Sequence, residues 1–263
     1  MKLFRILALA VGCAALAQAP ALAAPVLNTT TTGNVIMGTG IGNGGWNVVR
    51  VGNLELGLRA KVRWPVPQDV FNNNGDGTYS HAVGNGPANA ARWNFEWSIN
   101  SNINGDGANL AASNFTFILG MDYDAGLGTV FSTINPLFSS PANTSSFGNN
   151  TTVQGGGAEA NTAAGFDALV LANNLVQNSW NLDFFDAGVL FAGIFNPNTN
   201  GNYSFFLQAF NANGASVART DITVIAGSGA MATVPEPASL ALVSLALLGA
   251  GLASRRKTSA APR

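Results

Sequence analysis

The chain has 263 residues, of which 47% are apolar and only 10% are charged, and its formal net charge is −1 at pH 7. Residues 24–234 contain six Lys or Arg and twelve Asp or Glu, so this part of the chain is acidic. Acidic surfaces repel phosphate groups, which argues against nucleic acid and anionic lipid as partners.

A secretory signal peptide is predicted at residues 1–23. Two basic residues in the first five precede an apolar run that forms the signal helix, and Ala21 and Ala23 are the small residues that signal peptidase recognises. Cys13, the single cysteine, lies inside this segment. A lipoprotein signal is the alternative, but the usual leucine is missing before Cys13 and the apolar run continues past it. We therefore expect cleavage after Ala23 and a mature chain without disulfides.

Residues 24–226 are predicted to form an exported all-β body. The 31 Asn and 31 Gly residues of the chain tolerate positive φ and favour turns, and aromatic and β-branched runs lie between them. This pattern is typical of an antiparallel β-sandwich, Ig-like or jelly-roll-like, with long Asn/Gly-rich loops. About 200 residues are enough for one large or two small domains with a sizeable core.

Three strands are predicted in the first half of the body. Residues 28–45 resemble a loop, or contain an edge strand at 34–37. Residues 46–64 form one strand that places aliphatic and charged side chains on opposite faces, because the period of a strand is two. The next two strands are predicted at residues 91–103 and 115–124.

The second half of the body is predicted to be more irregular. Residues 139–165 are small and polar and indicate a long loop, or a joint between two halves. Residues 166–176 are compatible with a helix or a strand. Residues 195–225 predict a hairpin with its turn at 211–214. Residues 227–234 are rich in Gly and Ser and predict a flexible linker.

The C-terminal segment has the pattern of a membrane span. Residues 238–253 carry no charge and correspond to about 24 Å of helix, somewhat less than the roughly 30 Å hydrocarbon core of a bilayer. Pro235 and Pro237 exclude helix just upstream. The basic residues that follow the run keep residues 258–263 in the cytoplasm, so the body faces outward. A permanent anchor is one alternative. A core helix is another, but it would show a polar face.

The order of these features, within the last thirty residues, resembles the PEP-CTERM sorting signal of Gram-negative bacteria. The resemblance covers residues 233–257, with the signal itself at 235–257. The residues that match the family pattern are Pro235, Glu236, Pro237, Arg255 and Arg256. It implies that an exosortase, a membrane-embedded protease, recognises the Pro-Glu-Pro region, cuts the chain nearby and releases or transfers the body. It also implies a link to bacteria that produce exopolysaccharide.

Histidine, cysteine and lysine offer little catalytic chemistry in the body. His81 is the only histidine and the mature chain has no cysteine, which excludes Cys/His catalysis and zinc sites with several such ligands. No nucleophile elbow accompanies His81, so we expect an exposed loop or strand histidine rather than part of a Ser/His/Asp triad. Lys61 is the only lysine of the body, and nothing in its surroundings supports a Schiff base.

Carboxylates are the remaining candidates for chemistry. Asp122 and Asp124 would share a face of a strand, and Asp183 and Asp186 form a second pair. Two paired aspartates could serve a carbohydrate-active hydrolase if they stood about 5–10 Å apart. No signal for a raised-pKa acid beside a partner accompanies either pair.

Two Asn- and Gly-rich turns offer oxygen ligands for calcium. They lie at residues 72–77 and 102–107, and both contain Asn-Gly-Asp-Gly. An EF-hand loop requires a terminal Glu that neither turn supplies, so a simple β-turn is the better interpretation. We therefore expect no cofactor, with a calcium-stabilised glycan-binding module as an alternative.

The sequence thus predicts a non-enzymatic surface or extracellular-matrix protein, exported across the inner membrane of a Gram-negative bacterium. Its predicted partners are signal peptidase, an exosortase, the membrane through the C-terminal helix, and exopolysaccharide or other surface proteins. After processing, the body would lie at the cell surface or outside the cell. A secreted hydrolase that uses the paired aspartates is the alternative from a different class.

Overall fold

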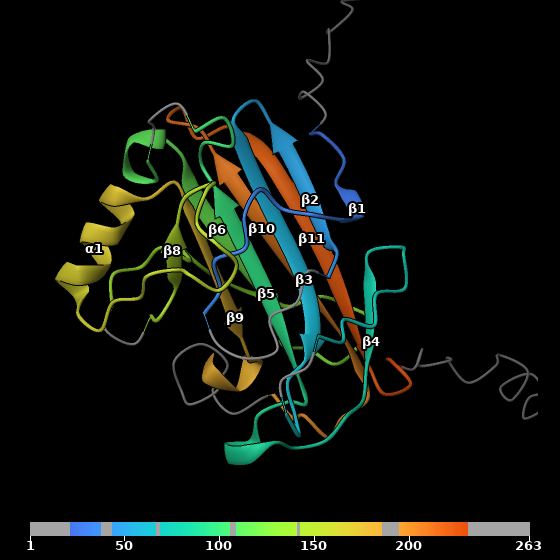
Figure 1. Cartoon of the computed structure of the whole chain (residues 1–263). Helices are drawn as coiled ribbons and strands as arrows, with labels where there is room; N and C mark the ends of the chain where they lie inside the picture. The colour runs from blue at the N-terminus through green and yellow to red at the C-terminus, as the bar shows by residue number, and fades with distance from the viewer. Residues whose placement is uncertain are drawn as a thin grey trace, which may run out of the picture.

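The computed structural model describes residues 22–37, 44–66, 69–105, 109–140, 143–185 and 195–230. In these residues two β-sheets lie face to face, with one α-helix beside them (Figure 1). The larger sheet contains, in spatial order, β1 (Val26–Thr29), β2 (Trp46–Val51), β3 (Leu54–Val62), β5 (Trp93–Asn100), β9 (Leu175–Trp180) and β8 (Ser146–Gly148). The smaller sheet contains β4 (Thr78–His81), β11 (Ser216–Ala226), β10 (Gly201–Phe210), β6 (Thr116–Asp122) and β7 (Phe131–Ile134). The helices are α1 (Ala163–Ala172) and three single 3-10 turns, η1 (Pro87–Asn89), η2 (Ala111–Ser113) and η3 (Leu182–Phe185).

The predicted all-β fold is confirmed for the described residues, but the prediction of fully antiparallel pairing is wrong at one edge. There β4 runs parallel to β11, with Thr78 beside Thr223 and His81 beside Ala226. The chain leaves the larger sheet after β3 and joins the smaller one as β4, so no short hairpin fixes the direction of this strand. Whether the sandwich is Ig-like or jelly-roll-like stays a prediction.

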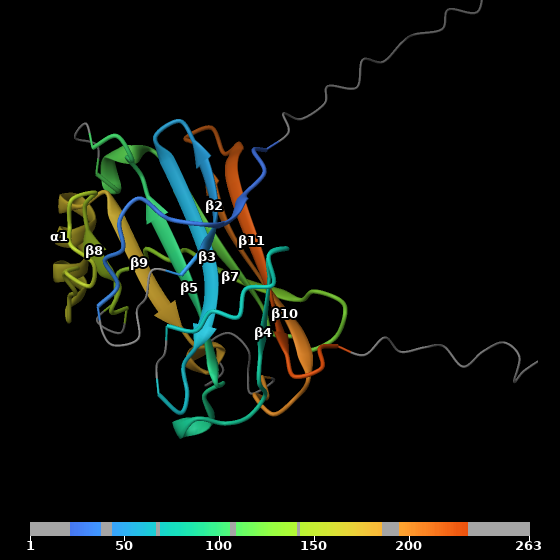
Figure 2. The same ribbon diagram turned by 45° about the vertical axis from the view of Figure 1, so that its right-hand side comes forward.

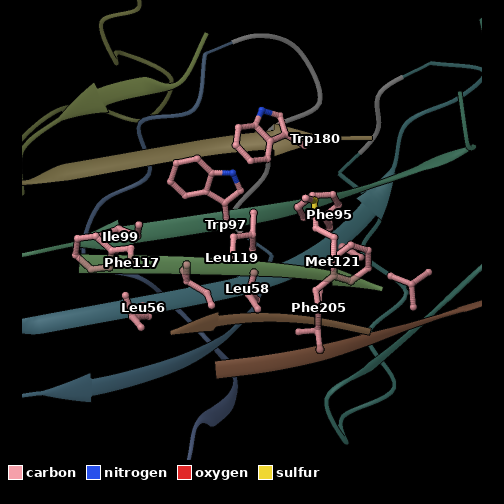
Figure 3. Packing of buried hydrophobic residues seen from close by; sticks show 14 of the residues in the cluster. Leu56, Leu58, Phe95, Trp97, Ile99, Phe117, Leu119, Met121, Trp180 and Phe205 are labelled. Carbon is pink, nitrogen blue, oxygen red and sulfur yellow. The ribbon is translucent and has the colours of Figure 1, made fainter. Parts of the chain in front are cut away.

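The hydrophobic core lies between the two sheets (Figure 3). Leu58 and Trp97 face inward from the larger sheet, and Leu119 faces them from the smaller one; each is fully buried. Phe95 of β5 stacks on Phe205 of β10, with ring centroids 4.3 Å apart. These aromatic contacts join the sheets and contribute about 1 kcal/mol beyond simple burial.

The strand predicted at residues 46–64 is two strands. A tight turn at Gly52 and Asn53 separates β2 from β3, and Gly52 has a φ of +57°. That left-handed conformation favours glycine, because a Cβ would be strained there. Val49 of β2 and Leu54 and Leu56 of β3 all face the core, so the turn shifts the alternation by one residue. The faces predicted for residues 54–62 are confirmed, but the single long strand is not.

The region between β7 and β10 contains more regular structure than predicted. The expected loop at 139–165 includes the short strand β8, whose Phe147 lies in the core. The ambiguous segment 166–176 is mainly α1, followed by the start of β9. Thr162 caps α1 by accepting a hydrogen bond from the backbone N–H of Gly165 at 3.0 Å.

Residues 26–226 supply every strand of the two sheets and all the residues of the core cluster. This part of the chain therefore has the means to fold by itself. Within the described ranges no helix is both long and apolar enough for a membrane span. The predicted signal helix, apart from residues 22–23, and the predicted membrane helix at 238–253 lie outside those ranges.

Candidate functional site

The outer face of the larger sheet is covered by residues 30–37, which we call the strap. In Figures 1 and 2 this blue segment leaves β1 and crosses in front of the neighbouring strands. Its backbone N–H groups donate to side chains of the sheet, from Thr32 to Glu55 Oε1 at 2.7 Å and from Val35 to Gln177 Oε1 at 2.7 Å. Met37 N–H donates to Ser146 Oγ at 3.0 Å. The strap is therefore attached to a largely polar face by hydrogen bonds, and its buried Val35 and Ile36 add apolar contacts, Ile36 with Trp46 and Val48.

A buried charge cluster lies on this face. Glu96 of β5 contacts Arg59 Nε at 2.5 Å and Lys61 Nζ at 3.0 Å, and all three residues are at most 1% exposed. The Arg59 guanidinium lies 4.1 Å from the ring centre of Trp46 and 4.4 Å from that of Phe71. Burial alone would raise the pKa of Glu96, but the charges of Arg59 and Lys61 outweigh it and lower that pKa. The cluster thus keeps three ionised groups inside the protein.

A cavity of about 390 Å³, which we call the outer-face cavity, lies beside this cluster. Ser146 Oγ donates to Glu159 Oε1 at 3.0 Å within it, and the ring of Phe184 is 55% exposed at its edge. The described residues that line it are Ile36, Met37, Lys61, Arg63, Thr144, Ser146, Glu159, Asn178, Ser179 and Phe184. Charges of both signs, hydroxyls, an amide and one exposed aromatic ring are a set that suits a hydroxylated ligand.

Two further cavities lie at the end of the sandwich where β11 finishes. The first, of about 490 Å³, is lined by Trp64, Pro65, Asn85, Gly86, Pro87 and Arg92. The second, of about 300 Å³, is lined by Tyr123, Asp124, Ala125, Val130, Asn196, Thr199 and Tyr203. Among the described residues that line them, neither cavity has two carboxylates, and Asp124 is the one acid.

The structure does not place Asp122 and Asp124 on one strand face as predicted. Asp122 ends β6, whereas Asp124 lies in the loop beyond it. The carboxylate of Asp122 accepts hydrogen bonds from the backbone N–H groups of Asp124, Val130 and Ser204, at 3.1, 3.0 and 3.5 Å. Burial raises the pKa of Asp122, although these hydrogen bonds oppose the rise. Asp122 therefore closes the 123–130 loop instead of facing a substrate.

The second aspartate pair is not brought together within the described residues. Asp183 lies in η3, where its backbone N–H donates to Asn181 Oδ1 at 3.2 Å. Asp186 lies outside the described residues. No candidate acid–base pair therefore emerges at this position.

The turn at residues 72–77 uses its polar oxygens locally. Asp76 Oδ1 accepts from the N–H of Thr78 at 2.9 Å and from its hydroxyl at 2.6 Å, and this bonding lowers the pKa of Asp76. Asn73 Oδ1 accepts from Gly75 N–H at 2.7 Å. Only residues 102–105 of the second turn are described, and no group of three or more potential His, Cys, Asp or Glu metal ligands occurs in the described chain.

His81 is not the exposed histidine that the sequence predicted. It ends β4, is 4% exposed and stacks on Trp93 with ring centroids 6.4 Å apart. Neither ring nitrogen has a hydrogen-bond partner in the described chain. Burial lowers the pKa of His81 to about 4, so the imidazole is neutral at pH 7. The pairing of β4 with β11 buries it, and this long-range contact left no local signal in the sequence.

Glu96, Glu159 and Phe184 are site residues that sequence analysis missed. The alternating charges of β3 were visible, but they did not reveal that Glu96 lies opposite Arg59 on the neighbouring strand. Glu159 and Phe184 come from irregular segments, where periodicity carries no information.

The predicted processing residues lie almost entirely beyond the described chain. These are Ala21, Pro235, Glu236, Pro237, Arg255 and Arg256; Ala23 is described and is exposed. Residues 233–257 match the family model of the PEP-CTERM protein-sorting motif, which confirms the resemblance over that segment. Comparison of the chain with curated proteins found no match. The motif supports a protein that passes through a membrane-anchored stage and that an exosortase sorts to the surface of a Gram-negative cell.

Glu96→Gln should destabilise the body by about 3–5 kcal/mol, because it leaves Arg59 and Lys61 buried without their shared anion. Urea unfolding of residues 24–230 measures this loss. Asp221→Asn is the matched control: it breaks the exposed Arg219–Asp221 pair, 2.6 Å long, and should cost at most about 1 kcal/mol. Equal losses in the two variants would contradict the assigned role of Glu96.

The stability of the body should fall as the pH drops below about 6.5, the ordinary pKa of histidine in an unfolded chain. Because the pKa of His81 in the folded state is about 4, the unfolded state binds more protons between these values. The expected loss is about 1.4 kcal/mol per pH unit across that window. Urea unfolding at pH 7, 6 and 5 measures it. His81→Phe keeps a ring against Trp93 and should flatten the dependence of the free energy of unfolding on pH. If this dependence is unchanged in the variant, other titratable groups cause it.

Proposed function

We propose that this chain is an exported, non-enzymatic surface or extracellular-matrix protein that an exosortase cleaves near Pro235 to release its body from the membrane. The observation that carries the proposal is the sorting motif at residues 233–257. A basic, then apolar, N-terminal segment that ends in Ala21 and Ala23 supports export by the secretory route.

The roles of the carboxylates support a non-enzymatic body. Asp122 is used by three backbone donors, and Glu96 by two cations. Of the described residues that line the outer-face cavity, Glu159 is the one carboxylate. A glycoside hydrolase needs two acids that flank one bond, and these residues do not supply such a pair.

The residues that line the outer-face cavity support exopolysaccharide as a ligand of the body. The exposed ring of Phe184 offers a flat apolar surface, while Glu159 and Arg63 offer hydrogen-bond acceptors and donors beside it. Sugars combine apolar ring faces with hydroxyl groups, so such a surface matches both parts of the ligand. We therefore propose that the body binds glycan chains of the matrix there.

In a host that contains an exosortase, the surface form of the protein should lack the peptide Leu240–Leu252. Mass spectrometry of the mature protein tests this. Changing Pro235, Glu236 and Pro237 together to Ala should leave the tail attached, because the enzyme would lose its recognition segment. Asp167→Asn, on the exposed side of α1, is the control and should be processed normally. An intact Leu240–Leu252 peptide in the surface form would refute cleavage.

Phe184→Ala should weaken retention of the body on exopolysaccharide from the producing cell about fivefold, equivalent to roughly 1 kcal/mol for a lost ring contact. Affinity electrophoresis of residues 24–230 in gels that contain the polysaccharide measures the change. Phe131→Ala, which removes a ring 36% exposed on the smaller sheet, is the matched control. If both variants bind like the native body, the outer-face cavity is not the glycan site.

A further inference from the structure

The body extends further toward the tail than the sequence predicted. Residues 227–230 belong to the predicted linker, but they are hydrogen-bonded to the body. Gly227 N–H donates to the carbonyl oxygen of His81 at 2.8 Å, and Ala230 N–H donates to Asn202 Oδ1 at 3.2 Å. Ser228 N–H donates to Asn200 Oδ1 at 3.4 Å. The last residue shown to be attached is therefore Ala230, only five positions before Pro235.

This attachment limits how far the body can lie from the membrane. A chain spans at most about 3.6 Å per residue, so Pro235 lies within about 18 Å of Ala230 and Ala238, where the apolar run begins, within about 29 Å. The 11 residues of β11 alone extend the body by roughly 34 Å away from this point. A membrane that holds residues 238–253 therefore cannot have the opposite end of the sandwich against it.

The end that remains near the membrane is a continuous surface, which we call the tail-proximal end. It includes residues 63–66, 69–70, 84–92, 123–131, 181–185, 196–200 and 227–230, because Val62 N–H donates to the carbonyl oxygen of Val70 at 2.9 Å and Asn181 Nδ2 donates to that of Ala91 at 3.0 Å. Hydrogen bonds connect these segments: Gly84 N–H donates to the carbonyl oxygen of Pro197 at 2.8 Å, and Asn198 Nδ2 donates to Asn85 Oδ1 at 2.5 Å. Figure 2 shows the loop between β6 and β7 beside the end of β11.

This end is less acidic than the body as a whole. Arg63 and Arg92 are two of the six basic residues between positions 24 and 234, whereas Asp69, Asp124 and Asp183 are three of the twelve acids. The Arg63 guanidinium lies 5.2 Å from the ring centre of Trp64, and Arg92 lines the same cavity as Trp64. Two apolar side chains of this end are also exposed, Val66 at 56% and Leu127 at 60%.

Tryptophan, arginine and scattered apolar side chains are the types that settle at a lipid headgroup layer. Basic residues close to the membrane are attracted by anionic lipids, whereas the acidic remainder of the body is repelled. The overall acidity argued against lipid as a partner of the chain. The two arginines near Trp64, at an end less acidic than the body as a whole, make this end the exception.

We propose that the tail-proximal end faces the lipid surface of the anchoring membrane before processing, held there by the short segment after Ala230, with Trp64, Arg63 and Arg92 at the headgroups. This inference rests on the proposed anchoring of the tail in the membrane. It implies that the exosortase meets the body in one orientation, with the segment to be cut beside the membrane.

Tryptophan fluorescence can test this orientation, because Trp64 is the only one of the five tryptophans that is not buried. The mature chain from Ala24 to Arg263 is reconstituted through its tail into phosphatidylethanolamine–phosphatidylglycerol vesicles, with or without brominated acyl chains. Bromine should quench part of the emission of the native chain. Trp64→Phe should lose at least four-fifths of that quenching.

Two similarly exposed leucines provide a matched pair of reporters. In the Trp64→Phe background, Leu127→Trp places an indole at the tail-proximal end, and Leu171→Trp places one on α1. Leu171 is 62% exposed and lies at the opposite end of the strands, because α1 leads directly into the start of β9. Bromine should quench the first reporter and leave the second unchanged. A fifteen-residue Gly/Ser insertion after Ala230 should lower the quenching of the first at least twofold.

The outcomes separate this inference from the proposed function. A chain that does not float with the vesicles contradicts anchoring by the tail, and this inference with it. A chain that floats with equal quenching at both leucine positions, or with none at Trp64, overturns the lipid-facing end alone. Quenching that appears only when an exosortase is reconstituted alongside would assign this end to the enzyme and overturn lipid as its partner. If the Leu127→Trp reporter is still fully quenched after the insertion, the short segment after Ala230 is not what holds this end at the membrane.

Discussion

The arrangement of polar residues on the outer face of the larger sheet depends on the buried carboxylate of Glu96. An ionised group with no exposure to water must be paired, and Arg59 and Lys61 supply two cations from the next strand. Arg59 then needs its own cover, which the rings of Trp46 and Phe71 provide. The strap completes the enclosure by donating backbone N–H groups to the polar side chains around the cluster. The sandwich thus has an apolar core between its sheets and a polar, covered layer outside the larger one.

Local sequence patterns predicted which residues share a face better than they predicted what lies against that face. The period of two identified β3, β5 and β6 and the final hairpin, since each alternates clearly over seven or more residues. It could not detect β8, because three residues are too few to show a period. It could not give the direction of β4 either, because the partner β11 lies more than a hundred residues away. The alternation of charges along β3 was correct, yet it is the strap together with the rings of Trp46 and Phe71 that buries those charges.

The same lack of information about long-range contacts explains why the roles of the candidate site residues were predicted incorrectly. Asp122 had the residue type of a catalytic acid, but the sequence did not show that three backbone N–H groups occupy its oxygens. Asparagine was interpreted as a turn former, whereas Asn174 Nδ2 donates to Asn100 Oδ1 at 2.9 Å and to Asn150 Oδ1 at 2.8 Å in a partly buried network. The sorting motif was predictable for the opposite reason. Its recognition residues are contiguous, so no fold was needed to bring them together.

The position of β11 also sets the order of events for a chain that crosses the membrane N-terminus first. This strand lies between β4 and β10, so the smaller sheet cannot close until residue 226 has emerged. Until then the core lacks Ala218, Ile222, Val224 and Ala226, the residues that β11 contributes. The residues that emerge next are those of the sorting motif. For such a chain, completion of the smaller sheet immediately precedes the emergence of the sorting motif.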